Sequence, residues 1–233
     1  MAEIKARGRY PKMNLNRITT KETRDQHFFL ALHSCSTTLG VAVLNSKTPE
    51  KICSSIYPIG RNLSNSLLTC ISKVLPTSYW NDITRISVAI GPGGFTGTRL
   101  TVVLARTLAQ QLNCQLDGIS SFALMAPRLV KKIEKSNLEN AFWITKTLPR
   151  RGIVGGKYHI KYNSKVSDLE EVLELKKPHL LEQNIDKLNS VSASDDVKTD
   201  IIRLLKLSFL EESIGRKSPW QKVLPIYPTS PVA

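Results

Sequence analysis

The chain has 233 residues, of which 41% are hydrophobic and 22% charged, and its formal net charge is +14. These proportions are typical of a globular protein with a sizeable core, and no stretch approaches the roughly 18 apolar residues of a membrane span. The four cysteines form no C-x-x-C pair and the four histidines no i, i+4 pair, so the pattern predicts neither a disulfide framework nor a metal site. We therefore expect a cytoplasmic protein without membrane contact, whose basic surface attracts polyanions.

Three regions are predicted along the chain. Residues 1–26 carry seven basic and three acidic side chains without an apolar period, which is typical of a flexible basic arm. Residues 27–126 should form a first α/β lobe. Because the chain turns polar and basic after Pro127, residues 127–233 are expected to form a second, smaller lobe and a C-terminal tail.

Apolar runs at 28–32 and 39–44 and a third segment at 51–57 predict three consecutive strands in an antiparallel meander. The other expected elements of the first lobe are a helix capped by Asn62 and ending before Pro76, a strand over 85–90, a helix over 100–112, a short strand over 115–118 and a helix from Ser120 or Ser121 through Met125.

The second lobe is less regular in sequence. We expect a strand pair over 141–147 and 153–162, a short helix over 167–175, a longer helix over 195–210 and a terminal strand or docked tail over 223–228.

The most informative segment is G-P-G-G-F-T-G-T-R, from Gly91 to Arg99, between a predicted strand and a predicted helix. Such a turn can hold phosphate, because backbone N–H groups and the positive end of the helix dipole face the same point. No Lys-Ser/Thr pair follows, which excludes a Walker loop. A dinucleotide motif would use Gly91, Gly93 and the later Asp117, but Thr96 takes the place of its third glycine and Pro92 removes one N–H. A tight turn with Thr96 as helix cap is the remaining interpretation, and composition leaves it level with an anion site.

The run from Ile86 to Gln111 resembles the signature of the TsaB (YeaZ) family, G-P-G-S-F-T-G-x-R followed by a helix of small residues. Gly94 departs from it, because that family has Ser there. Residues 30–35, 118–124 and 225–227 are similar to further segments of the family, so the resemblance is strong over 28–125 and faint afterwards.

This resemblance implies an α/β, actin-like (ribonuclease H-like) nucleotide-binding fold with two lobes, the second reduced. It suggests a nucleotide or phosphate loop made of Gly91, Gly93, Gly94, Thr96, Gly97 and Arg99 with Ser34, Ser36 and Thr37 from the first hairpin turn. No cofactor is firmly expected, and ATP or ADP with magnesium at a degenerate or inter-subunit site stays open. His33 stands where the superfamily has an acidic residue near its metal, and the H-x-x-x-H metal pair of the sister TsaD proteins is missing.

The resemblance therefore implies a non-catalytic subunit that binds and activates TsaD in threonylcarbamoyladenosine modification of tRNA. TsaE would join the assembly, a homodimer is allowed, and tRNA would be met indirectly through the complex. The surface expected to meet the partner comprises Leu63, Leu67, Ile71, Arg99, Val103, Leu104 and Leu108. Two alternatives stay open: an actin-like small-molecule kinase or glycoprotease-like hydrolase, and a direct tRNA-binding module suggested by the net charge.

Overall fold

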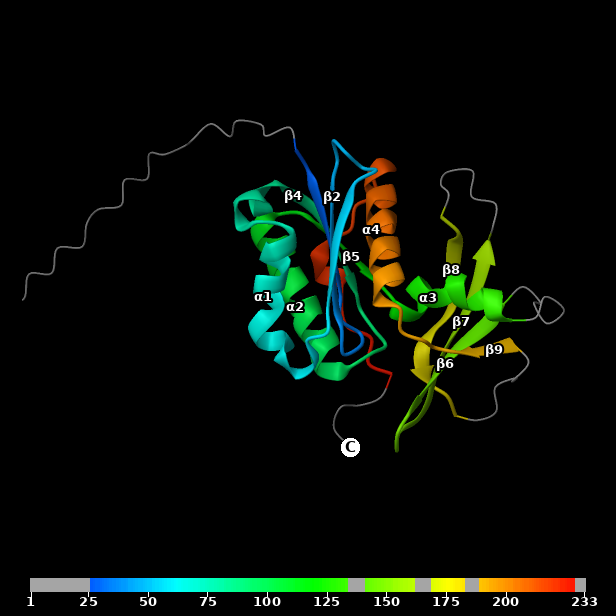
Figure 1. The fold of residues 1–233 in the computed structure, drawn as a ribbon. Helices are drawn as coiled ribbons and strands as arrows, with labels where there is room; N and C mark the ends of the chain where they lie inside the picture. The colour runs from blue at the N-terminus through cyan, green and yellow to red at the C-terminus, as the bar shows by residue number, and fades with distance from the viewer. Residues whose placement is uncertain (1–25, 134–140, 162–168, 183–188, 229–233) are drawn as a thin grey trace, which may run out of the picture.

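The structure, a computed structural model, describes residues 26–133, 141–161, 169–182 and 189–228. The predicted basic arm at 1–26 lies almost entirely outside these residues. Figure 1 shows two β-sheets side by side, with helices on both faces of the first sheet and one helix against the second. This is the mixed α/β, two-lobed arrangement that the sequence predicts.

The first sheet has the strand order β3-β2-β1-β4-β5. Strands β1 (Phe28–His33), β2 (Leu39–Asn45) and β3 (Ile52–Tyr57) form the predicted antiparallel meander. Strands β4 (Ile83–Ala89) and β5 (Gln115–Ile119) follow in parallel to β1. Every residue of β1 is buried, because helices cover both faces of the sheet at its centre.

Helices α1 (Leu63–Val74) and α2 (Phe95–Leu112) cover one face of this sheet, and α4 (Val197–Ser213) covers the other. A Cβ on Gly40 would lie 2.7 Å from Val197 Cγ1, so the glycine lets the start of α4 approach β2 closely. The division of the chain at residue 127 is corrected here. Helix α4 comes late in the sequence but packs on the first sheet, whose second apolar face would otherwise meet water.

The second sheet has the order β8-β7-β6-β9. It comprises β6 (Phe142–Leu148), β7 (Gly152–Lys161), β8 (Glu171–Leu180) and the short β9 (Ser190–Ser192), and α3 (Ser121–Leu129) packs on one of its faces. The predicted helix over 167–175 is wrong, because this segment enters β8 and pairs antiparallel with β7. Short 3-10 helices lie at Gly60–Asn62, Thr77–Asp82, Val130–Lys132 and Trp220–Lys222.

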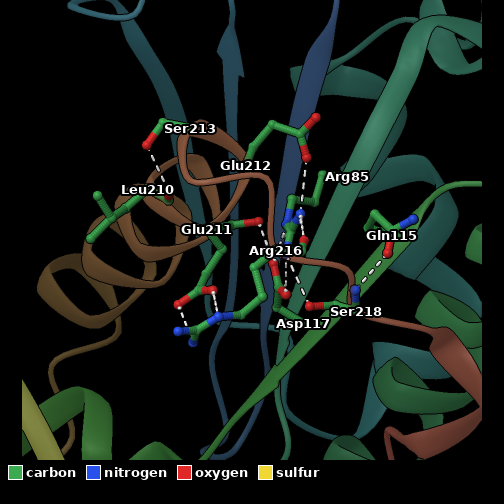
Figure 2. A network of polar contacts seen from close by, with 10 residues as sticks. Arg85, Gln115, Asp117, Leu210, Glu211, Glu212, Ser213, Arg216 and Ser218 are labelled. Atoms are coloured by element: carbon green, nitrogen blue, oxygen red, sulfur yellow. Dashed lines mark hydrogen bonds and ion pairs between the residues drawn. The ribbon is translucent and has the colours of Figure 1, made fainter.

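A buried ionic network fixes the end of α4 and the following tail to the first sheet (Figure 2). Arg85 on β4 is fully buried and donates from Nε and Nη2 to the Asp117 carboxylate on β5, at 2.7 and 2.9 Å. Its Nη1 donates to Glu212 Oε2 and to the Arg216 carbonyl, both at 2.9 Å, and Nη2 also reaches Ser218 Oγ at 3.0 Å. The guanidinium thus uses all of its donors to join four segments of the fold.

Beyond this network the tail runs along β5 and reaches the glycine-rich turn at Ile226. The Leu116 amide donates to the Ser218 carbonyl at 2.9 Å, and the Ile226 amide donates to the Ile90 carbonyl at 2.8 Å. Of the two expectations for 223–228, a docked tail is therefore the one observed. No helix within the described ranges is long and apolar enough to cross a membrane.

Candidate functional site

The glycine-rich turn, residues 91–97, leaves β4 and begins α2. Two other segments hold it. The Gly94 amide donates to the Cys35 carbonyl in the first hairpin turn at 2.9 Å. Ser121, at the start of α3, donates from its amide to the Gly91 carbonyl and from its hydroxyl to the Pro92 carbonyl, both at 2.7 Å. The turn is therefore a junction between the sheet, α2, α3 and the first hairpin.

The glycines of this turn serve close packing. A Cβ on Gly93 would lie 2.2 Å from the Cys35 carbonyl oxygen, and one on Gly97 would lie 2.9 Å from the Ser34 carbonyl oxygen. Gly91 has φ +101°, a conformation that L side chains rarely adopt. A phosphate-binding turn would leave open space beside its glycines. Here the backbone of the first hairpin turn occupies that space. The sequence favoured neither a tight turn nor an anion site, and the geometry favours the tight turn.

Most of the predicted loop residues nevertheless line one cavity of about 500 Å³ on the outer side of the turn. Arg61, which the sequence analysis missed, contributes a cation to its wall. Ser34, Ser36, Thr37, Gly94, Thr96 and Gly97 line it; Gly91, Gly93 and Arg99 do not. The predicted cap is corrected as well, because Gly94 occupies the N-cap position and Thr96 lies within the first turn of α2. With Arg61 and a helix N-terminus but no carboxylate in its wall, the cavity suits an anion better than a metal ion.

His33 lies at the end of β1, where the superfamily pattern would place an acidic residue. The side chain is buried and neither ring nitrogen has a hydrogen-bond partner. Burial lowers the pKa of His33 from 6.5 to about 4, partly offset by Asp195, while Arg128 lowers it further. The imidazole is therefore neutral at physiological pH and supplies no carboxylate oxygen for magnesium. In the described part of the chain, no group of three or more His, Cys, Asp or Glu side chains could hold a metal ion.

A buried neutral histidine makes folding stability depend on pH. Because the folded pKa is near 4 and the unfolded pKa near 6.5, the unfolded chain binds the proton more readily between these values. The His33 contribution is complete above pH 6.5 and is lost as the pH falls toward 4. Between pH 7 and pH 5 we expect the free energy of unfolding to fall by about 2 kcal/mol from this residue alone. Urea unfolding at the two pH values measures it.

His33→Leu should remove most of that pH dependence, whereas His179→Gln, which alters an exposed histidine, should leave it intact. Equal dependence in the wild type and His33→Leu would contradict the assignment.

The nucleophiles nearest to His33 in sequence are not activated. Burial raises the pKa of the Cys35 thiol to about 11, so the thiolate is scarce at neutral pH. The Ser34 hydroxyl is 2.7 Å from the Thr101 hydroxyl and donates to the Gly97 carbonyl at 2.9 Å. These contacts attach the hairpin to α2 and place no general base beside the serine.

A second cavity of about 290 Å³ lies between the two lobes. Phe95 and Tyr227 form one aromatic wall, with ring centroids 5.3 Å apart, and Lys146 and Arg151 bring positive charge from the second lobe. Composition gave no signal for this cavity, because its walls come from the glycine-rich turn, the β6–β7 hairpin and the tail.

The expected partner surface on α1 and α2 is partly corrected. Leu63, Leu67 and Ile71 are at most 8% exposed and belong to the core beneath these helices, so they cannot form a contact surface. Leu104 and Leu108 are partly buried against the same core. Val103 is 52% exposed and Arg99 is exposed, as a surface role requires, and Leu68, which the sequence analysis missed, is 53% exposed. The outward face of the two helices thus carries the apolar pair Leu68 and Val103.

One comparison with known proteins matches this part of the chain directly. Residues 57–137, which include α1, β4, α2, β5 and α3, match the family model described as TsaD, tRNA N6-adenosine threonylcarbamoyltransferase. The chain is 33% identical over 99 residues to the tRNA threonylcarbamoyladenosine biosynthesis protein TsaB of Bacillus subtilis (strain 168), covering 42% of each protein. It is 28% identical over 89 residues to the protein of that name from Buchnera aphidicola subsp. Schizaphis graminum (strain Sg). That match covers 36% of this chain and 42% of the relative. The chain thus spans less than half the length of these curated relatives.

Two solved structures extend the likeness to most of the fold. YeaZ from Pseudomonas aeruginosa superposes with a TM-score of 0.56 at 17% identity, covering 86% of this chain and 99% of that one. A protein described as similar to peptidase YeaZ from Pseudomonas aeruginosa gives a TM-score of 0.58 at 18% identity, with 87% and 100% coverage.

The two sheets, their helices and these structural neighbours define an actin-like, two-lobed α/β protein. Within that class, the chain is similar to TsaB proteins over less than half of its length and shares the fold of YeaZ.

Proposed function

We propose that this chain is a non-catalytic subunit in threonylcarbamoyladenosine modification of tRNA, and that it binds and activates a TsaD-type transferase through the outward face of α1 and α2. The names of its relatives support the pathway. The observation that carries the binding role is the pair Leu68 and Val103, two large apolar side chains more than half exposed on adjacent helices. Interface cores are rich in such exposed apolar groups.

The groups at the turn support a role without catalysis. A buried neutral His33, a protonated Cys35 and a cavity wall without carboxylates give a kinase or hydrolase no general base and no magnesium ligand there. These residues do not fit ATP or ADP with magnesium, so any such nucleotide would take its metal ligands from another subunit, which is the inter-subunit site left open by the sequence. We propose TsaE and a second copy of this chain as further occupants of the assembly, in the cytoplasm.

The proposal predicts that Leu68→Glu or Val103→Glu weakens binding to the transferase by about 30-fold, the effect of losing a ~2 kcal/mol hot spot. The free energy of unfolding should change by less than about 0.5 kcal/mol, because both side chains are on the surface. Affinity is measured by titration calorimetry with purified TsaD, and folding by urea denaturation.

Ile214→Glu is the matched control, since Ile214 is 50% exposed at the end of α4, on the opposite side of the first sheet. It should bind TsaD as the wild type does. If the Leu68 and Val103 variants bound TsaD with unchanged affinity, the interface would lie elsewhere on the chain. If TsaD modified tRNA equally well with and without this chain, the activating role would be refuted.

A further inference from the structure

The second sheet has one face that no described element covers. Its other face carries Phe142, Ile144, Val154 and Tyr158 and packs against α3. Side chains alternate along a strand, so Trp143 on β6 and Lys157 on β7, which are direct cross-strand partners, point to the opposite side. We call this side the outer face.

Trp143 lies within a group of basic side chains on the outer face. The Lys157 and Lys176 amino groups lie 6.0 and 5.8 Å from its ring centroid, and the His179 ring centroid is 6.0 Å away. Lys176 pairs with Lys157 across the strands, so the two lysines come from neighbouring positions of β7 and β8. An indole with basic groups around it combines a stacking surface with charges for a backbone of phosphates.

Two further basic residues of β7 lie on the same face. His159 and Lys161 follow Lys157 at alternate positions of β7 and therefore point the same way. One outward-pointing strand residue is acidic: Glu171, at the start of β8, whose carboxylate lies 3.8 Å from the Lys161 amino group. The outer face is therefore predominantly basic within a chain of net charge +14, and it complements a polyanion.

We propose that the outer face binds a single-stranded segment of RNA, with a base stacked on Trp143 and phosphates contacted by Lys157 and Lys176. Exposed lysine–indole contacts are weak, so a base can displace an amino group from the ring while that group turns to a phosphate. A single strand fits better than a duplex, because only unpaired bases present their faces to an aromatic side chain. This site gives no local signal in the sequence, because its basic and aromatic residues are adjacent in the sheet and separated in the chain. The site is independent of the proposed pairing with TsaD.

The test is fluorescence anisotropy with the full chain and a labelled 12-nucleotide adenylate RNA at several salt concentrations. Trp143→Ala should weaken binding by about tenfold or more, and Trp143→Phe should restore most of it. Lys157→Glu combined with Lys176→Glu should weaken binding further and lower the salt slope by about 1.4, since each phosphate contact contributes ~0.7 on single strands.

The matched control is Lys73→Glu combined with Lys206→Glu, which makes the same change of charge at exposed positions of α1 and α4. Site-specific binding predicts a much smaller effect for this pair. An equal effect, equal affinity for a 12-base-pair RNA duplex, equal competition by polyglutamate, or no RNA binding at 50 mM salt would each overturn the proposal. Urea unfolding of every variant separates lost binding from lost folding, and the lysine pair tests the site without altering the core.

Discussion

Asp117→Ala is expected to lower the free energy of unfolding by about 3–5 kcal/mol, because it leaves the fully buried Arg85 guanidinium without its main counter-ion. Asp117 accepts two hydrogen bonds from Arg85 and one from Ser208 at 2.9 Å, so the variant also orphans a buried hydroxyl. Urea denaturation followed by far-ultraviolet circular dichroism measures the loss.

Glu171→Ala provides the control, since it removes a carboxylate from an exposed pair with Lys161 and should cost less than about 1 kcal/mol. Replacing both partners, Arg85→Met with Asp117→Leu, should recover much of the loss, because a buried pair is less costly to replace with apolar groups than to break. A loss below 1 kcal/mol for Asp117→Ala would show that the pair is dispensable.

The same variant should loosen the tail. Arg85 also binds the Arg216 carbonyl and the Ser218 hydroxyl, and the tail beyond them supplies Ile226 and Tyr227 to the inter-lobe cavity. Hydrogen exchange at the Leu116 and Ile226 amides should accelerate, because both amides donate to bonds that hold the tail in place. Asp117 is thus a structural ion-pair partner and not the acidic residue of a dinucleotide motif.

Local sequence patterns predict the elements of the first lobe well. The runs at 28–32 and 39–44 are apolar throughout, which is what a strand covered on both faces requires. The outward direction of α1 was predicted less well, since Leu67 and Leu68 are adjacent and equally apolar, yet one is 3% and the other 53% exposed. Only the position of the sheet decides between them.

Contacts between distant segments account for the remaining errors. Strand β8 resembles a helix in sequence because its spacing of Val172, Leu173 and Leu175 fits both periods, and its pairing with β7 decides the outcome. The close packing of α4 on the first sheet depends on Gly40, which lies more than 150 residues before this helix. No local sequence pattern connects the two. The glycine-rich turn was recognised from sequence, but its contact with Cys35 was not.

Gly93→Ala tests whether that contact is what the turn requires. An added Cβ would lie 2.2 Å from the Cys35 carbonyl oxygen and 2.6 Å from its Cα, and neither backbone atom can rotate away as a flexible side chain could. The hairpin and α2 would have to separate, at a cost of about 3 kcal/mol, the upper end of the usual range for overpacking. Thermal and urea unfolding measure the loss.

Gly94→Ser is the control one residue away, because a Cβ on Gly94 meets nothing within 4 Å. Its φ of −58° is open to any residue, and serine at an N-cap can accept a hydrogen bond from the first turn of α2. We expect Gly94→Ser to be neutral or slightly stabilising. If Gly93→Ala and Gly94→Ser behaved alike, close packing against the hairpin would not explain the glycines, and an anion held by the backbone of the turn would become the better account.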